Sequence, residues 1–253
     1  MWIAGGKSVI GTAHEKAALP CQDCWAFRAG GEPSPRMVIA LADGAGFAKH
    51  AEIGARISVD HVIQEMAGYS GHLHEAGENE VRAWLSSVRE RLRIEAEKAK
   101  SSVADFSGTL LAAILENDAA FVWQIGDGGW IVQKEKGIEA ATWPNSGEYI
   151  NQTVFAVSDR AFDEWTHAYL TGVRAILGFT DGLEHLCLDY LNKSVHEPLV
   201  AKFFASLKAD PSQIELENHL EAFLSSRLVN DRTDDDKTMV LAWQRPVSKH
   251  AVG

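Results

Sequence analysis

Three apolar runs in this sequence end in the same way, with an aspartate followed by a glycine. The runs VIALA, FVWQI and AILGF lead within two residues into Asp43-Gly44, Asp127-Gly128 and Asp181-Gly182. Hydrophobic residues fill nearly every position of these runs, a pattern typical of strands covered on both faces. One Asp-Gly pair after a strand is usually only a turn. Three pairs after covered strands favour stacked sheets with helices outside, and carboxylates gathered at one edge.

Turn residues between other apolar runs predict antiparallel pairing. Two pairs of short strands are each separated by three or four turn residues and are predicted hairpins: Thr109–Leu115 with Ala119–Ile125, and Trp130–Gln133 with Ile138–Ala141. Two amphipathic helices precede them, because apolar residues recur at helical spacing over Lys49–Ala67 and Glu80–Ala99.

The C-terminal part of the chain predicts helices followed by one last strand. We expect helices within Glu184–Ser206. A further helix is predicted to begin with Asp210 as its N-cap and Pro211 at its first position, and to end near Leu228. The final strand is predicted over Thr238–Gln244.

Composition limits the class of protein. The formal net charge of −11 argues against nucleic acid or an anionic membrane as the main partner, because phosphate groups attract clustered Lys and Arg. Three cysteines, no recognisable signal peptide and no apolar run of membrane-spanning length predict a cytoplasmic protein. Since no repeat or linker divides the 253 residues, we predict a single α+β domain over residues 1–253.

Five aspartates stand where predicted strands begin or end: Asp23, Asp43, Asp127, Asp181 and Asp235. At one edge of a sheet sandwich, their carboxylates would repel one another unless cations lay between them. Hard divalent cations such as Mn²⁺ and Mg²⁺ prefer oxygen ligands of this kind. Gly44 lacks a Cβ, so its carbonyl can approach a metal closely. The alternative for Asp234–Asp236 is a solvated acidic loop.

Six short motifs, each weak alone, occur along almost the whole chain. They are Gln22-Asp23, Ala42-Asp43-Gly44-Ala45-Gly46, Ser107-Gly108-Thr109, Ile125-Gly126-Asp127-Gly128, Thr180-Asp181-Gly182-Leu183 and Asp235-Asp236-Lys237-Thr238. Their order resembles that of the metal-dependent protein serine/threonine phosphatases of the protein phosphatase 2C type. The stretches GEYINQT and FLSSRLVNDRTDDDKT look like the compact bacterial branch of that family.

The resemblance implies a sandwich of two antiparallel β-sheets flanked by pairs of α-helices, with two metal ions, Mn²⁺ or Mg²⁺, at one edge. Carried over by position, Asp43 bridges both ions, and Asp181 and Asp235 complete the shell of one of them. These three are the predicted catalytic residues. A water shared by two such ions loses its proton near neutral pH and attacks phosphorus in line.

The resemblance assigns metal-related roles to three further residues. Gly44 offers its backbone carbonyl to the ions, and Asp23 lies close by and acts through water. Asp127 matches the acid that holds, together with Asp181, a third and weaker metal in many members. The predicted metal residues are therefore Asp23, Asp43, Gly44, Asp127, Asp181 and Asp235.

Two departures from the family pattern concern phosphate binding and proton transfer. Many members carry an arginine shortly before the Gln/Glu-Asp pair to bind the substrate phosphate, and HEKAALPCQD has none. His14 and Lys16, in the expected loop Thr12–Pro20, are the candidates for phosphate binding. Members of the animal type place a histidine after Asp-Gly as general acid. Ala45 stands there, so a metal-bound water would protonate the leaving oxygen.

We therefore predict hydrolysis of phosphoserine and phosphothreonine in proteins, with a Ser/Thr kinase and its targets as partners. The alternative is a catalytically weak pseudophosphatase that binds phosphoproteins, which the missing arginine motivates. Action on small phosphorylated metabolites is a third reading. Cys21 and Cys24 form a C-x-x-C pair, interpreted as two packing cysteines or a redox switch, because zinc would need a second pair.

Overall fold

Two antiparallel five-stranded sheets are stacked face to face in the structure, a computed structural model that describes residues 1–30, 36–144 and 153–245. Sheet A has the order β1 (Trp2–Val9), β12 (Lys237–Gln244), β9 (Val173–Phe179), β6 (Gly129–Lys134) and β7 (Gly137–Ala140). Sheet B has the order β2 (Asp23–Ala29), β3 (Met37–Asp43), β4 (Leu110–Glu116), β5 (Ala119–Ile125) and β8 (Thr166–Leu170).

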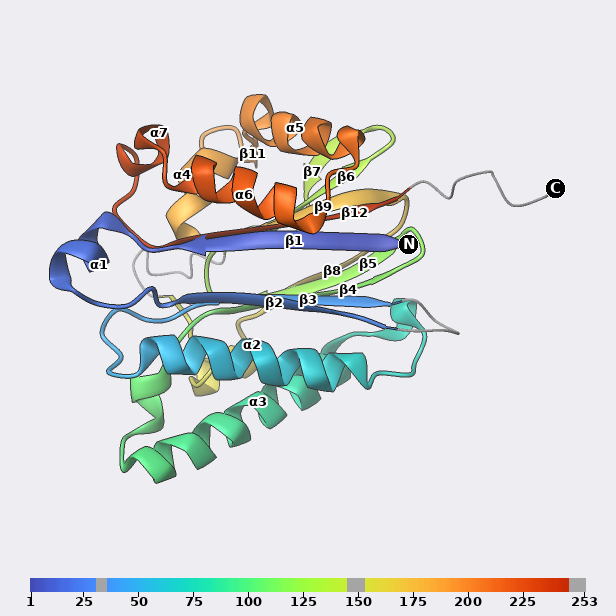
Figure 1. Cartoon of the computed structure of the whole chain (residues 1–253). Coiled ribbons are helices and arrows are strands. Elements are labelled where there is room, and N and C mark those ends of the chain that lie inside the picture. The colour runs from blue at the N-terminus through green and yellow to red at the C-terminus, as the bar shows by residue number, and fades with distance from the viewer. Residues whose placement is uncertain (31–35, 145–152, 246–253) are drawn as a thin grey trace.

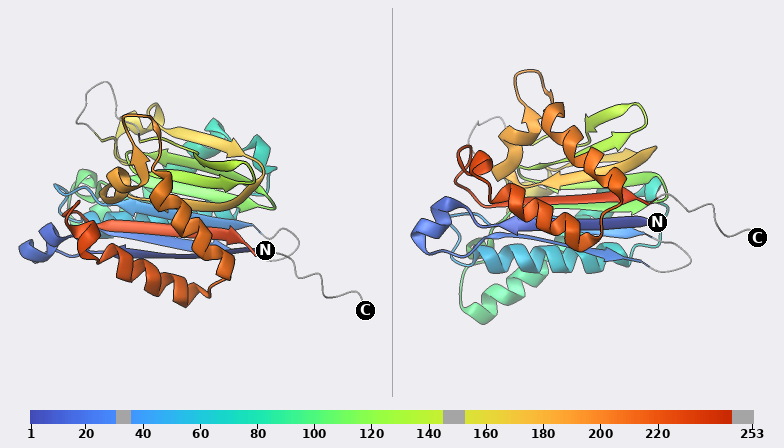
Figure 2. Two further views of the ribbon diagram at one scale, coloured as in Figure 1. Left: turned by 90° about the horizontal axis from the view of Figure 1, so that it is seen from above. Right: turned by 45° about the horizontal axis from the view of Figure 1, so that its top comes forward.

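Helices cover the outer face of each sheet (Figure 1). Sheet B carries α2 (Ala51–Ala67) and α3 (Glu78–Ala99), while α5 (Glu197–Ser206) and α6 (Gln213–Leu224) lie over sheet A. The view from above in Figure 2 shows α5 and α6 lying over the strands of sheet A. The predicted fold class, a sandwich of two antiparallel sheets flanked by helix pairs, is confirmed.

The layer order explains why the strands are apolar at successive positions. Neighbouring residues of a strand point to opposite faces of its sheet. In β3, Val38 and Ala40 belong to the hydrophobic cluster under α2 and α3, whereas Ile39 and Leu41 belong to the cluster between the two sheets. Both faces therefore bury hydrophobic side chains, as the sequence pattern predicts.

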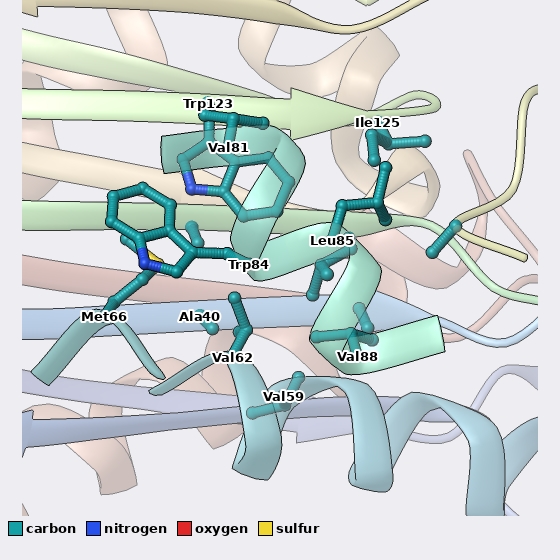
Figure 3. Packing of buried hydrophobic residues seen from close by; sticks show 14 of the residues in the cluster. Ala40, Val59, Val62, Met66, Val81, Trp84, Leu85, Val88, Trp123 and Ile125 are labelled. Carbon is teal, nitrogen blue, oxygen red and sulfur yellow. The ribbon is translucent and has the colours of Figure 1, made fainter. Parts of the chain in front are cut away.

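The interface of α2 and α3 with sheet B is filled by interlocking apolar side chains (Figure 3). Trp84 of α3 stacks on Trp123 of β5, with ring centroids 6.4 Å apart. The figure also shows aliphatic residues of both helices against the strands: Val59, Val62, Val81, Leu85 and Val88. This packing buries the face of sheet B that lies under α2 and α3.

Both predicted hairpins form, but in different sheets: β4 with β5 in sheet B, and β6 with β7 in sheet A. Asp127 stands in the connection between them, where the chain passes from one sheet to the other. The two early helices and the last strand agree with prediction to within two residues. The sequence pattern gave no indication that consecutive hairpins divide between the layers.

The predicted start of the late helix is wrong. Asp210 has a φ of 48° and ends a 3-10 turn (Leu207–Ala209), and Ser212 is the N-cap of α6. Ser212 accepts a hydrogen bond from the Glu215 backbone, and the Glu215 carboxylate accepts one from the Ser212 backbone. This reciprocal capping box outweighs the Asp-Pro signal. The helix also ends at Leu224, before a separate α7 (Arg227–Asn230).

Three short elements lie near the end of the sandwich to the left in Figure 1. The expected loop at Thr12–Pro20 contains α1 (Thr12–Ala17). Between β9 and α5, a two-stranded ribbon of β10 (Leu188–Asp189) and β11 (Ser194–Val195) follows α4 (Glu184–Cys187), where only helices were expected.

The remaining short elements are 3-10 turns: η1 (Leu73–Glu75), η2 (Val103–Phe106), η3 (Asp159–Phe162), η4 (Asp181–Leu183) and η5 (Leu207–Ala209). Among the described residues, none of the helices combines the length and the apolar character needed to cross a membrane.

Candidate active site

The predicted aspartates come together at the edge of the sandwich where α1 lies (Figure 1). Asp23 begins β2 and Asp43 ends β3, and the antiparallel register places these two residues opposite each other. Asp181 follows β9 and Asp235 precedes β12, which pairs with β9. A cavity of about 360 Å³ lies at this edge, lined by four of the five predicted aspartates: Asp43, Asp127, Asp181 and Asp235.

The fifth aspartate, Asp23, is buried beside this cavity. Its Oδ2 accepts hydrogen bonds from the hydroxyls of Thr180, at 2.8 Å, and Thr238, at 2.7 Å. Burial is the main cause that raises the pKa of Asp23 to about 7, and the two hydroxyls act against that rise. The network joins the start of β2 in sheet B to the residue after β9 and to the start of β12 in sheet A, so Asp23 links the two sheets.

Asp43 is a buried acid at the centre of the repulsion in the site. Burial, followed by repulsion from Asp23, Asp181 and Asp235, holds its pKa well above the ordinary value for an aspartate. Its backbone nitrogen donates to Thr109 Oγ1 at 3.0 Å, and its carbonyl accepts from the Thr109 nitrogen at 2.8 Å. These bonds fix the end of β3 against the start of β4.

Gly44 continues from Asp43 in a place that excludes a side chain. A Cβ there would come within 2.7 Å of the Ala51 carbonyl carbon and oxygen, at the start of α2. Its backbone nitrogen donates to the Gln22 carbonyl at 3.1 Å. Glycine is therefore required by the close approach of α2, whatever else its carbonyl binds.

Asp181 and Asp127 form the other side of the cavity. Burial raises the pKa of Asp181 to about 8, with further contributions from repulsion by Asp127 and Asp235. The Asp235 pKa is also raised, mainly by burial. Thr153 donates a hydrogen bond to Asp127 Oδ2 at 2.7 Å.

The oxygens of this edge fit a hard divalent cation. Among the described residues, buried Oδ1 atoms of Asp23, Asp127 and Asp181 and the buried Oε1 of Gln22 have no hydrogen-bond partner. Burying acceptors without partners is unfavourable unless something positive or hydrogen-donating meets them. Within the described ranges, no three His, Cys, Asp or Glu side chains form a metal-binding group as they stand. The carboxylates thus perturb one another's pKa values without already forming a coordination shell.

Asp236 is a site residue that the motif analysis did not separate from its acidic neighbours. Its carboxylate is 1% exposed and accepts hydrogen bonds from the backbone nitrogens of Gly11 and Gln22, both at 2.6 Å. It also lies 2.9 Å from Nδ1 of His14. Sequence alone gave no signal for this burial, because its partners lie more than 200 residues away.

Glu184 is a second residue that the sequence analysis missed. Its carboxylate accepts hydrogen bonds from the Gly128 nitrogen and the Tyr190 hydroxyl, both at 2.5 Å. Burial raises its pKa to about 7, and repulsion from Asp127 adds to the rise. Glu184 thereby links the β5–β6 connection, which contains Gly128, to Tyr190 in the turn between β10 and β11.

The two predicted phosphate-binding residues lie differently. His14 lines the cavity, whereas Lys16, two residues later on α1, is exposed and is not among the lining residues. Ala45 lines the cavity as well. Cys21 and Cys24 are both free thiols. β2 begins between the two cysteines. Cys24 packs against the hydrophobic cluster under α2. The Cys21 sulfur lies 3.8 Å from the Asp23 carbonyl oxygen.

Comparison with known proteins agrees with this fold and identifies the family. The family model described as protein phosphatase 2C matches residues 10–225, a range that ends before Asp235. The chain is 36% identical over 248 residues to serine/threonine-protein phosphatase 3 of Escherichia coli (strain K12), covering 95% of this chain and 98% of that protein.

Solved structures show the same architecture at low sequence identity. A serine/threonine phosphatase of S. agalactiae superposes with a TM-score of 0.67 and 16% identity, covering 97% of this chain and 100% of that chain. PppA, described as a key regulatory component of T6SS in Pseudomonas aeruginosa, superposes with a TM-score of 0.64 and 19% identity, covering 96% and 97%. The motif order, the fold and the matched relatives lead to one conclusion: the chain belongs to the protein phosphatase 2C family of serine/threonine-protein phosphatases.

Proposed function

We propose that this chain hydrolyses phosphoserine and phosphothreonine in proteins with the help of Mn²⁺ or Mg²⁺. The observation that carries the proposal is the group of buried, mutually repelling aspartates around the cavity at the α1 edge of the sandwich. Family membership supports it, since the protein phosphatase 2C family is metal-dependent in general. When bound, two divalent cations supply positive charge for the phosphoryl oxygens and lower the pKa of water toward neutrality.

The residues proposed to hold these cations are those that the family motifs assign. Asp43 would bridge two ions, with Asp181, Asp235 and the Gly44 carbonyl as further ligands. Asp23 would act through water, and Asp127 with Asp181 would hold a third, weaker ion. The raised pKa values of Asp43 and Asp181 support this, because a cation between the carboxylates removes the repulsion that raises them.

The chain's own residues also prepare the site. Thr109 holds the end of β3, and the hydroxyls of Thr180 and Thr238 hold Asp23. The acids therefore need little rearrangement when a cation binds. Phe155 and Ala45 line part of the cavity and restrict the space open to water.

We further propose that residues 1–253 form a single phosphatase domain and that the chain acts in the cytoplasm on phosphorylated proteins. A Ser/Thr kinase and its targets would be the natural partners. The free cysteines support a reducing compartment. The name of the 36% identical relative, serine/threonine-protein phosphatase 3, supports phosphoprotein substrates.

The replacement Asp43→Asn tests the proposed function. The carboxamide keeps nearly the same shape but removes the charge that two cations would share. We expect hydrolysis of a phosphothreonine peptide with Mn²⁺ to fall by about 100-fold or more. The fold should persist, because the change also relieves repulsion, and circular dichroism would check this.

Asp60→Asn is the matched control, because Asp60 is an exposed aspartate on α2. Its activity should equal that of the wild type. Activity of Asp43→Asn within a few-fold of the wild type would contradict the assignment of Asp43. Peptide binding by the wild type without phosphate release at any Mn²⁺ concentration would instead establish the alternative, a pseudophosphatase that binds phosphoproteins.

A further inference from the structure

A histidine–aspartate pair stands at the rim of the cavity. His14 belongs to α1 and lines the cavity together with the acids. Its Nδ1 lies 2.9 Å from Oδ2 of Asp236, and the two side chains are 16% and 1% exposed. Two elements that are 222 residues apart in the sequence therefore meet through this pair. The partner of the histidine is a buried carboxylate, and the histidine itself reaches the cavity.

The hydrogen bonds of Asp236 assign the proton on the imidazole. The Gly11 nitrogen donates to Oδ1, and the Gln22 nitrogen donates to Oδ2, the same oxygen that contacts His14. Backbone N–H groups can only donate, so Asp236 accepts in both backbone contacts, and a carboxylate has no hydrogen to donate to Nδ1 in the third. Nδ1 of His14 therefore carries a hydrogen directed at Asp236, and Nε2 is the ring atom that remains available for chemistry in the cavity.

The leaving group creates a need that this atom can meet. A seryl or threonyl oxygen is a poor leaving group, and a side chain that protonates it as the bond breaks accelerates the step. Neither lysine nor arginine is among the described residues that line the cavity, and His14 is the histidine among them. The other charged lining residues are acids: Asp43, Asp127, Asp181, Asp234 and Asp235.

We propose that His14 is the general acid of the proposed phosphatase reaction and that Asp236 is the residue that positions it. The bond between phosphorus and the seryl or threonyl oxygen breaks, and its electron pair stays on that oxygen. The proton on Nε2 moves to the same oxygen. The imidazole is left neutral, with its remaining hydrogen on Nδ1 toward Asp236. The attacking water releases one proton to solvent, and the imidazole regains one from solvent before the next turnover.

This inference rests on the proposed function, and it replaces the metal-bound water, expected from the family resemblance, as the proton donor. It competes with two other roles for the same residue. His14 would have a purely structural role if it only fastened α1 to the segment of Asp236. It would have a phosphate-binding role if it contacted the phosphoryl oxygens, which are common to every substrate. Both roles affect all phosphate esters equally. A general acid matters only where the leaving oxygen needs a proton, so the leaving group separates the general-acid role from the other two.

The variant for the test is His14→Gln. Glutamine is a polar side chain of similar length, but its amide cannot transfer a proton at neutral pH. Two substrates are compared with Mn²⁺: a phosphothreonine peptide and 2,4-dinitrophenyl phosphate, whose leaving oxygen is stable without a proton. We expect kcat on the peptide to fall by about 100-fold or more, within the range for general acids. The loss on the aryl ester should stay below about 10-fold, because that step does not need a proton from the enzyme.

His219→Gln is the matched control, because His219 is an exposed histidine on α6. It should leave both rates unchanged. Equal losses of His14→Gln on both substrates, or no loss on either, would overturn the proposal while the wild type remains an active phosphatase. A wild type that hydrolyses neither ester would refute the proposed function and this proposal together, so the two failures are distinguishable.

A second measurement does not depend on turnover. In metal-free protein labelled with ¹⁵N-histidine, the signals missing from His14→Gln identify His14 in the wild-type spectrum. At a pH where the ring is neutral, we expect the shifts of a protonated Nδ1 and an unprotonated Nε2. The opposite tautomer would overturn the assigned role of Asp236. This readout needs no Asp236 variant, in which two backbone N–H groups would lose an acceptor.

Discussion

Burial governs the charge of individual carboxyl groups at this site. Asp181 and Asp23, with pKa values of about 8 and about 7, differ from exposed aspartates mainly because the protein removes water from them. Repulsion among neighbours adds to the effect at Asp181. Without a cation, the folded protein therefore holds protons that the unfolded chain, with ordinary aspartate pKa values, has released.

The first prediction is a pH dependence of stability in metal-free protein. Because the folded state binds more protons than the unfolded state between about pH 4 and pH 8, the free energy of unfolding should fall as pH rises through this window. Each carboxyl that keeps its proton contributes a slope of about 1.4 kcal/mol per pH unit. Urea denaturation in EDTA at several pH values measures the slope. It should be shallower in Asp181→Asn.

Asp60→Asn serves as the control here too and should keep the wild-type slope. An Asp181→Asn protein with the same slope as the wild type would show that Asp181 is already ionised without metal. That result would contradict a raised pKa for Asp181 in the metal-free protein.

The sequence identified the acidic residues of the site, but it did not show which residues contact them in the folded chain. Asp43 and Asp181 could be singled out because each follows an apolar strand and precedes glycine. Asp236 could not be distinguished from Asp234 or Asp235, since nothing local tells which of three consecutive aspartates points inward. Its burial depends on Gly11 and Gln22, which approach only after the chain has folded.

The short helix α1 brings His14 to the cavity, although it has only six residues. This helix of six residues has no fully buried side chain, so its own packing contributes little to holding it in place. It is held from outside: the Ala13 nitrogen donates to the Asp234 carbonyl at 2.9 Å, and the Gly11 nitrogen donates to Asp236. The position of α1 at the cavity therefore depends on its N-terminal end.

The second prediction concerns that end. A Cβ at Gly11 would lie 2.3 Å from the Asp235 carbonyl carbon and 2.4 Å from the Asp234 oxygen, so Gly11→Ala must displace backbone. We expect kcat/KM to fall by about 100-fold, because small displacements of reacting groups are costly. Peptide hydrolysis and thermal melts would be measured together, and activity should be lost at temperatures where the variant is still folded.

Gly77→Ala offers the comparison, since a Cβ at Gly77 meets nothing within 4 Å and its φ is −166°. That variant should match the wild type in both measurements. Full activity of Gly11→Ala would show that the segment of Asp234–Asp236 can shift without harm, and that the position of α1 is unimportant for catalysis.

The elements also show which sequence signals are reliable. Hairpins and amphipathic helices were predicted correctly because their turn residues and periodicities are local. The start of α6 was not, because Asp210-Pro211 and Ser212-x-x-Glu215 are competing local signals and only the second forms its hydrogen bonds. No local pattern predicted α1, whose stability comes from contacts with a distant segment.

For the whole molecule, the acidic edge implies that cation binding and folding are linked. A cation that binds only the folded protein stabilises it by mass action. The third prediction is that Mn²⁺ at about 100 times its dissociation constant raises the melting temperature by about 5–10 °C. The increase should be smaller in Asp181→Asn and Asp235→Asn, because each removes a proposed ligand. Scanning calorimetry at constant ionic strength measures the effect.

Sodium chloride at equal ionic strength is the control, since screening alone would also weaken repulsion. Equal shifts with sodium and manganese, or no shift with either, would contradict a specific cation site. Equal Mn²⁺ shifts in the wild type and both variants would place the binding elsewhere on the protein.

The position of β12 has a consequence for how the enzyme is made. This strand lies inside sheet A, between β1 and β9, and the segment just before it supplies Asp235 and Asp236. A chain emerging from the ribosome thus holds β1 and β9 without the strand that joins them until residues 237–244 are synthesised. Such long-range pairing is slow to form. A chain that lacks residues 235–244 therefore has an incomplete cavity, and we expect it to release no phosphate from a phosphopeptide.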